Sequence, residues 1–180
     1  MMFMKICLYG AGSKNIAEKY KKEAYELGKE IAKRNHQLVY GGGDTGIMGA
    51  TSRGVIDNGG KVLGIAPEWM TDYEGLCKDC SRFIHTKTMD DRKTLFLKHS
   101  DAFIVAPGGI GTLDEFFEIL TLRRLERHDK KIVIFNSHGF YNHLLSMMDF
   151  LFNEKVLVDN IYDMFHVANS IDDVFKYLED

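Results

Sequence analysis

The sequence predicts one α/β domain over residues 1–180, a Rossmann-like three-layer α/β/α sandwich with a mostly parallel sheet. Two observations support this fold class. Short β-rich runs alternate with segments of helical periodicity along the chain, which is typical of a parallel sheet with crossover helices. The runs are also apolar enough for burial on both faces. At 180 residues the chain has the size of a single domain.

The first half of the chain contains three strands and two helices. The run at 3–10, "FMKICLYG", is the first strand, and "QLVYGGG" at 37–43 is the second, ending in glycines. Between them, spacing of i, i+3 and i+4 predicts a long helix with one apolar stripe. The segment 46–60 is a helix of small residues that stops at a glycine pair, and 61–67 is the third strand. The stripe of the first helix consists of Ala17, Tyr20, Ala24, Leu27 and Ile31.

Residues 68–89 interrupt this rhythm. They contain the only tryptophan, Trp69, a C-x-x-C pair and one possible short strand at 83–86, "FIHT". We interpret the segment as an elaborated crossover loop, and loops of this length are often functional.

Regular alternation returns in the second half. A helix over about 90–99 leads to the strand "DAFIVA", then come a helix over 112–127 and the strand "KIVIFN". A helix from Phe140 to Phe152, a short strand "MFHVA" and a C-terminal helix complete the chain. In such a fold the strand ends and helix starts share one edge of the sheet, where ligands bind. We therefore expect five distant segments to be neighbours in space: 10–13, 41–46, 67–68, 90–93 and 108–115.

Composition excludes several classes of function. The chain is 45% apolar and 27% charged, as soluble globular proteins are, and its net charge of −3 calls for neither nucleic acid nor an anionic membrane. No stretch approaches the roughly 18–20 apolar residues of a membrane span. The apolar run before Gly10 is too short for a signal peptide. We expect a cytoplasmic protein.

The three cysteines do not predict a disulfide scaffold. Cys7 lies within the first strand and reads as a small buried hydrophobe. Cys77 and Cys80 form one C-x-x-C, whereas a structural zinc site needs four ligands. His85 and His99 are possible additional ligands, so a zinc or redox role stays open beside the simpler interpretation of reduced thiols in a loop.

The common nucleotide motifs do not fit. "GAGSKN" at 10–15 has Asn15 where a dinucleotide fingerprint needs its third glycine, and the second strand ends in "VYGGG" rather than in an acid. No G-x-x-x-x-G-K-[ST] motif for triphosphates occurs. The glycine-rich turns still suit a phosphate, because glycine lets backbone N–H groups approach oxygen atoms and helix starts favour anions.

The stretch "PGGIGTLDEFFE" at 107–118 allows two interpretations of Glu115. It is a carboxylate beside a phosphate cradle, or the last residue of a T-x-x-E capping box that begins at Thr112. Those four residues alone favour the cap, whereas the preceding PGG-x-G and the upstream pair Arg92-Lys93 favour the carboxylate. The pair itself has a plainer interpretation as a solvated helix start with Asp90 as its N-cap.

Three motifs in this order resemble the LOG (Lonely Guy) family: "GGGDTGIMG" at 41–49, "MDDRK" at 89–93 and "PGGIGTLDE" at 107–115. These proteins are cytokinin-activating phosphoribohydrolases, often mislabelled as lysine decarboxylases. The resemblance implies hydrolysis of the N-glycosidic bond of an adenosine 5′-monophosphate, typically N6-modified, to free base and ribose 5-phosphate. It also implies a homodimer that works without a metal or cofactor on a nucleoside monophosphate substrate. We find no lysine placed for the Schiff base that a decarboxylase needs.

The resemblance places the catalytic roles on Arg92, at the leaving base or reaction centre, and on Glu115. Because adjacent helical residues point about 100° apart, Lys93 receives a supporting role near phosphate or sugar. Several weaker candidates have structural alternatives: glycines that turn the chain, a serine that caps a helix, a helical threonine. The candidate substrate-binding residues are Lys93, Gly108, Gly109, Ile110, Gly111, Thr112, Gly42, Gly43, Gly46, Ser13, Thr121 and Glu68.

Cleavage of a ribosyl–purine bond builds positive charge on the sugar, as in glycosidases. A carboxylate about 4 Å away contributes about 4 kcal/mol at an effective dielectric of about 20. This is roughly a thousandfold in rate. The rival hypothesis is a carrier of the same fold that holds a nucleotide-like ligand without cleaving it, as related molybdenum-cofactor carriers do.

Overall fold

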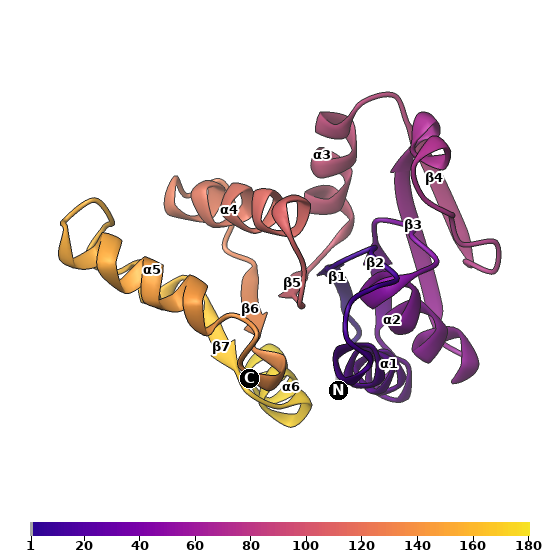
Figure 1. Cartoon of the computed structure of the whole chain (residues 1–180), viewed down its shortest axis with the longest axis horizontal. Coiled ribbons are helices and arrows are strands. Elements are labelled where there is room, and N and C mark those ends of the chain that lie inside the picture. Colours follow the sequence, from indigo (N-terminus) through magenta and orange to yellow (C-terminus); the bar gives the residue numbers. More distant parts are fainter. Residues whose placement is uncertain (1) are drawn as a thin grey trace.

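The computed structural model describes residues 2–180 and confirms the α/β/α fold class (Figure 1). Seven parallel strands form one sheet in the order β4-β3-β2-β1-β5-β6-β7. Their bounds are β1 (Lys5–Tyr9), β2 (Gln37–Tyr40), β3 (Lys61–Pro67), β4 (Arg82–Thr86), β5 (Ala102–Val105), β6 (Lys131–Phe135) and β7 (His166–Ala168).

Helices cover both faces of the sheet. Their bounds are α1 (Glu18–Lys33), α2 (Gly46–Asp57), α3 (Met89–His99), α4 (Ile110–Arg124), α5 (Asn142–Asn153) and α6 (Ile171–Glu179). Short 3₁₀ turns are η1 (Glu68–Asp72), η2 (Ser137–Gly139) and η3 (Ile161–Asp163). No helix within residues 2–180 combines the length and the apolar character that a bilayer crossing requires.

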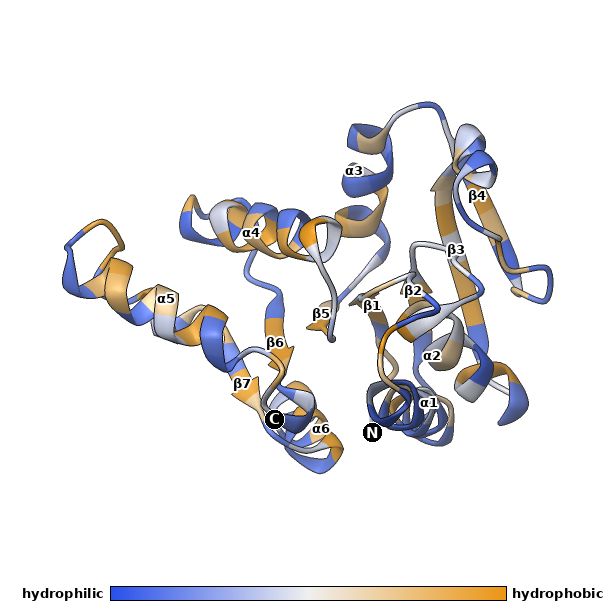
Figure 2. Cartoon of the chain, viewed as in Figure 1, coloured by the Kyte–Doolittle hydropathy of each residue, from blue (hydrophilic) through white to orange (hydrophobic). Residues whose placement is uncertain are grey.

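Strand periodicity divides the core into two clusters. Ile6 and Leu8 of β1 pack with α1, α2 and α6 on one face, while Cys7 and Tyr9 pack with α3, α4 and α5 on the other. Figure 2 shows the central strands largely in hydrophobic colours and α1 largely in hydrophilic ones. The strands are therefore buried on both sides, as the sequence predicts.

The strand order changes direction at β1, and this sets the place of the site. From β1 the chain proceeds to β2 on one side, while β5 pairs with the other side of β1. The loops that follow β1 and β5 consequently lie together: the amide of Ala11 donates to the carbonyl of Pro107 at 2.9 Å. A crevice at such a switch point is where open α/β sheets bind ligands.

Two helix starts differ from the prediction. The N-cap of α3 is Thr88, not Asp90, because Thr88 and Asp91 form a capping box at 3.0 and 3.2 Å. Helix α4 begins at Ile110 with Gly109 as its N-cap, two residues before the predicted start. The strand predicted at 83–86 is present as β4.

Candidate active site

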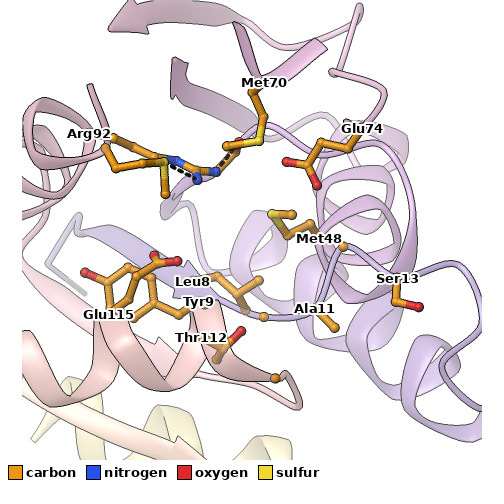
Figure 3. A pocket seen from close by; sticks show the side chains of 16 residues that line it. Leu8, Tyr9, Ala11, Ser13, Met48, Met70, Glu74, Arg92, Thr112 and Glu115 are labelled. Carbon is orange, nitrogen blue, oxygen red and sulfur yellow. Dashed lines mark hydrogen bonds between the residues drawn. The ribbon is translucent and has the colours of Figure 1, made fainter. Parts of the chain in front are cut away.

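A cavity of about 350 Å³ opens at the carboxyl ends of β1 and β5 (Figure 3). Six segments line it: the end of β1 with the loop after it, the glycine turn after β2, the start of α2, the segment from η1 to β4, the start of α3 and the start of α4. The lining residues are Leu8, Tyr9, Gly10, Ala11, Gly12, Ser13, Gly41, Met48, Met70, Glu74, Met89, Arg92, Gly109, Gly111, Thr112 and Glu115.

Arg92 is a buried cation fixed by backbone carbonyls. Its Nε donates to the carbonyl of Ile65 at 2.9 Å and its Nη2 to that of Gly41 at 2.7 Å. The guanidinium also lies over the ring of Phe96, 5.4 Å from its centroid. A Cβ at residue 41 would stand 2.1 Å from Nη2, so any other residue there would displace the guanidinium. These contacts hold the positive charge at the cavity wall in one position.

Glu115 lies in the second turn of α4 and faces Arg92 across the cavity (Figure 3). Within residues 2–180 no ion pair joins the two side chains, so the space between them is open to a ligand. Burial raises the pKa of Glu115 to about 8, although the charge of Arg92 acts in the opposite direction. The capping-box interpretation is wrong, because Gly109 is the N-cap and Thr112 already lies inside the helix.

The start of α4 offers free amides to the cavity. The first helical bond runs from the amide of Leu113 to the carbonyl of Gly109, so the amides of residues 110–112 have no partner within the helix. A Cβ on Gly109 or Gly111 would meet nothing within 4 Å, and neither residue has a positive φ. Neither packing nor backbone conformation requires glycine there. The open space lies where an anion would approach the amides.

The glycine turn after β2 shapes the cavity wall instead of entering the cavity. Gly42 and Gly46 have φ values of +82° and +64°. The amides of Ile47 and Met48 at the start of α2 donate to the carbonyl of Ala11 at 2.8 and 3.1 Å. The loop after β1 therefore already provides the hydrogen-bond acceptor for the amides at the start of α2. Of the predicted turn, only Gly41 lines the cavity.

Lys93 points to a different surface. It forms ion pairs with Asp114 at 3.2 Å and Glu118 at 3.5 Å, which join α3 to α4. Ile110 is 90% exposed and Glu68 is exposed. The cavity brings together six of the predicted residues, Ser13, Arg92, Gly109, Gly111, Thr112 and Glu115, and leaves out Lys93, Gly108, Ile110, Gly42, Gly43, Gly46, Thr121 and Glu68.

Glu74 is the acid that the segment after β3 contributes to the cavity, in place of Glu68. Burial raises its pKa, and the charge of Arg92 again opposes the shift. Neither acid belongs to a periodic pattern. The only feature of the sequence that points to Glu74 or Glu68 as a site residue is its position in a long loop.

Three methionines line the cavity, although sequence reasoning treats methionine as core filler. Met48 comes from α2 and Met70 from η1 (Figure 3), and Met89 comes from α3. Methionine is flexible and polarisable, so this wall suits a flat apolar ligand of variable size. No lysine lines the cavity, so its described wall contains no amine for a Schiff base. Among residues 2–180 no three His, Cys, Asp or Glu side chains form a potential metal site.

Comparison with known proteins shows which family the chain resembles. Residues 48–178, well over half of the chain, match the family described as "Possible lysine decarboxylase". The chain is 38% identical over 178 residues to the cytokinin riboside 5′-monophosphate phosphoribohydrolase LOG1 of Arabidopsis thaliana, covering 99% of this chain and 84% of that one. It is 36% identical to the enzyme LOG of Oryza sativa subsp. japonica over 158 residues, covering 88% and 65%.

Solved structures share the fold at lower identity. The molybdenum cofactor binding protein of Rippkaea orientalis aligns with a TM-score of 0.75 and 23% identity, covering 99% of this chain and 97% of that one. A molybdenum cofactor carrier protein of Chlamydomonas reinhardtii aligns with a TM-score of 0.74 and 21% identity, covering 99% and 96%. On the strength of the family match and of relatives aligned along nearly its whole length, the chain belongs to the LOG family and is a hydrolase of the LOG type.

Proposed function

We propose that this protein hydrolyses the N-glycosidic bond of adenosine 5′-monophosphate, N6-modified forms included, to free base and ribose 5-phosphate. The observation that carries the proposal is the placement of Glu115 and Arg92 on facing walls of one cavity, beside the free amides that begin α4. A carboxylate, a fixed cation and an anion site are the three groups that this reaction uses.

The phosphate binds at the start of α4 in this proposal. The amides of residues 110–112 and the positive end of the helix dipole attract it, and Gly109 and Gly111 let it approach the backbone. Thr112, which is buried and lines the cavity, adds a hydroxyl at the same place.

Glu115 acts at the anomeric carbon. As the bond from the sugar carbon to the base nitrogen breaks, its carboxylate stabilises the positive charge on the ribose and receives a proton from the attacking water. Arg92 donates hydrogen bonds to the departing base, whose nitrogen gains a proton from solvent. Arg92 keeps its own proton throughout, because guanidinium groups do not deprotonate in proteins.

The base lies towards Glu74 and the three methionines. An adenine ring and an alkyl group on N6 present apolar surface to Met48, Met70 and Met89. Glu74 offers an acceptor for the N–H on N6 when ionised.

The test is direct. Purified protein is incubated with AMP and with N6-isopentenyl-AMP, and free base is measured by chromatography. Glu115→Gln and Arg92→Ala are each expected to lower the release of base by at least about a hundredfold with the circular dichroism spectrum unchanged. Full turnover in Glu115→Gln would refute the role of the carboxylate.

The alternative function is a carrier that holds a nucleotide-like ligand intact. The similarity in fold to molybdenum cofactor proteins favours it. Tight binding of a nucleotide with no release of base from any N6 variant would select the carrier. The unpaired charges of Glu115 and Arg92 favour the hydrolase, because a carrier gains nothing from an acid next to a phosphate.

We also propose that the protein is a cytoplasmic homodimer, as its LOG resemblance implies. Helix α5 presents Phe150 at 61% exposure and Met147 at 46%, which a second copy would cover. Light scattering of the eluting protein should give twice the chain mass. Phe150→Asp should reduce it to one chain mass.

A further inference from the structure

The C-x-x-C pair lies directly behind the cavity wall. We call residues 73–81 the thiol loop. Cys77 and Cys80 flank a bend at 78–79, and both side chains pack against the core cluster beneath α1 and α2. The hydroxyl of Tyr40, which is fully buried at the end of β2, lies 3.6 Å from the sulfur of Cys80. The two thiols therefore share one partly buried polar cluster.

Backbone contacts connect the thiol loop to the glycine turn after β2. The amide of Cys77 donates to the carbonyl of Gly42 at 2.8 Å, and the amide of Asp44 donates to the carbonyl of Gly75 at 3.1 Å. Gly43 and Leu76 form an antiparallel bridge between these contacts. These contacts connect the thiol loop, which contains Glu74, to a turn whose first residue, Gly41, accepts a hydrogen bond from Arg92.

The surroundings distinguish the two thiols. Burial, with a contribution from the neighbouring Cys77 thiol, raises the pKa of Cys80 to about 12. The sulfur of Cys80 also lies against the buried hydroxyl of Tyr40, so its thiolate is disfavoured and we assign the first attack to Cys77. Within residues 2–180 no further ligand completes a metal site around the pair. Reversible oxidation is the chemistry that two adjacent thiols can perform without a third group.

We propose that Cys77 and Cys80 form a thiol–disulfide exchange site whose co-reactant is a low-molecular-weight disulfide, and that the resulting disulfide stiffens the thiol loop and so fastens its backbone hydrogen bonds to the glycine turn. The thiolate of Cys77 attacks one sulfur of the small disulfide, forms a mixed disulfide and releases one small thiol. Cys80 then loses its proton and attacks the sulfur of Cys77, which releases the second small thiol. The protein loses two hydrogen atoms, and the small disulfide gains them.

The chemical step is tested by mass spectrometry with oxidised glutathione as the probe. The intact protein should lose two hydrogen atoms, with Cys77 and Cys80 in one cross-linked peptide, and dithiothreitol should reverse the change. Cys80→Ser should stop at a glutathione adduct on Cys77, whereas Cys77→Ser should react at least about tenfold more slowly. Cys7, buried within β1, is the internal control and should stay unmodified.

Two results would overturn this step. One is the absence of a Cys77–Cys80 disulfide under conditions in which the unfolded chain forms it. The other is equal reaction of the two single variants, which would contradict the assigned order of attack.

The fastening is tested by hydrogen exchange, which does not depend on any enzymatic activity and so separates this proposal from the proposed hydrolase. A cross-link limits local opening, so the amides of Asp44 and Cys77 should exchange about tenfold more slowly in the oxidised protein. The amide of Asp101, bonded to the carbonyl of Lys5 at 2.7 Å at the other edge of the sheet, should not change. Unchanged or faster exchange at Asp44 and Cys77 would overturn the coupling.

Discussion

At the scale of single residues, Glu115 shows a conflict between stability and chemistry. Its partly buried carboxyl faces a fixed guanidinium without forming an ion pair with it, and desolvation outweighs the attraction, so its pKa rises to about 8. A raised pKa means that the folded protein binds a proton that the unfolded chain has released. The free energy of unfolding therefore falls as pH rises from the ordinary carboxyl range towards about 8.

This conflict predicts the pH dependence of both activity and stability. Because the ionised carboxylate does the chemistry, kcat/KM should rise with pH to a plateau, with a midpoint near 8. Glu115→Gln should lose activity but melt at a higher temperature than the wild type at pH 8, since an amide carries no charge to bury. Rate measurements and thermal melts from pH 6 to 9.5 check both. A midpoint near the ordinary carboxyl pKa would contradict the prediction.

A substitution at Gly111 should weaken ligand binding without lowering the stability of the fold. Nothing in the protein contacts a Cβ at this position, and alanine favours helices over glycine. Gly111→Ala should therefore melt at the same or a higher temperature than the wild type, while its methyl group, placed near the free amides, should raise the KM for AMP at least about tenfold. Initial rates over a range of AMP concentrations and thermal melts measure the two effects. A lower melting temperature would mean that the glycine is structural.

At the scale of elements, the relation between α3 and α4 matters most. Arg92 and Glu115 stand on different helices, and the residues next to them, Lys93 and Asp114, form an ion pair between those helices, with Glu118 as a second partner. The positive charge of Lys93 also lowers the pKa of Glu115, whereas Asp114 and Glu118 raise it. Lys93 is thus a positioning residue that acts through its neighbours.

Replacing Lys93 should move the pH profile more than the stability. In Lys93→Met the two acids lose their counter-charge, so the pKa of Glu115 should rise and the midpoint of the activity profile should move to higher pH. Because Asp114 and Glu118 are partly exposed, the free energy of unfolding should change by no more than about 1 kcal/mol. Lys93→Arg keeps the charge and should restore the profile. A lower kcat with no change in the midpoint of the pH profile would contradict the electrostatic role of Lys93.

At the scale of the whole molecule, the two edges of the sheet have different tasks. The cavity lies at the carboxyl edge, and a polar cluster at the amino edge connects the C-terminal helix to the rest of the fold. There Glu179 of α6 accepts from Arg34 at 2.7 Å and lies 3.1 Å from the ring nitrogen of His36, which is buried. This cluster joins the C-terminal helix to the start of β2, and no member of it lines the cavity.

Breaking this cluster should affect stability alone. Glu179→Ala removes the acceptor of Arg34 and should lower the free energy of unfolding by about 1–2 kcal/mol, with the melting temperature a few degrees lower. The kcat and KM for AMP should match the wild type at 25 °C. Urea denaturation and rate measurements check this. A changed KM would show that the two edges are coupled.

Much of the site follows from local sequence. The alternation of strands and helices specifies the sheet, and the ends of the strands specify the edge that binds the ligand. Arg92 and Glu115 lie within the first two turns of α3 and α4, close to the edge of the sheet at which both helices begin. The start of α4 was less predictable, since T-x-x-E reads as a cap until the backbone shows that Gly109 has that place.

The sequence by itself determined the fold class, the edge of the sheet that carries the cavity and the two helices that carry Arg92 and Glu115, because burial and turns impose short-range patterns. Only the tertiary structure decided that Glu74 rather than Glu68 reaches the cavity, that three methionines form its wall and that Lys93 points to α4. The physical reason is that these side chains are directed by contacts between distant segments. The bonds from Asp44 to Gly75 and from Cys77 to Gly42 orient the thiol loop, and no local pattern encodes them.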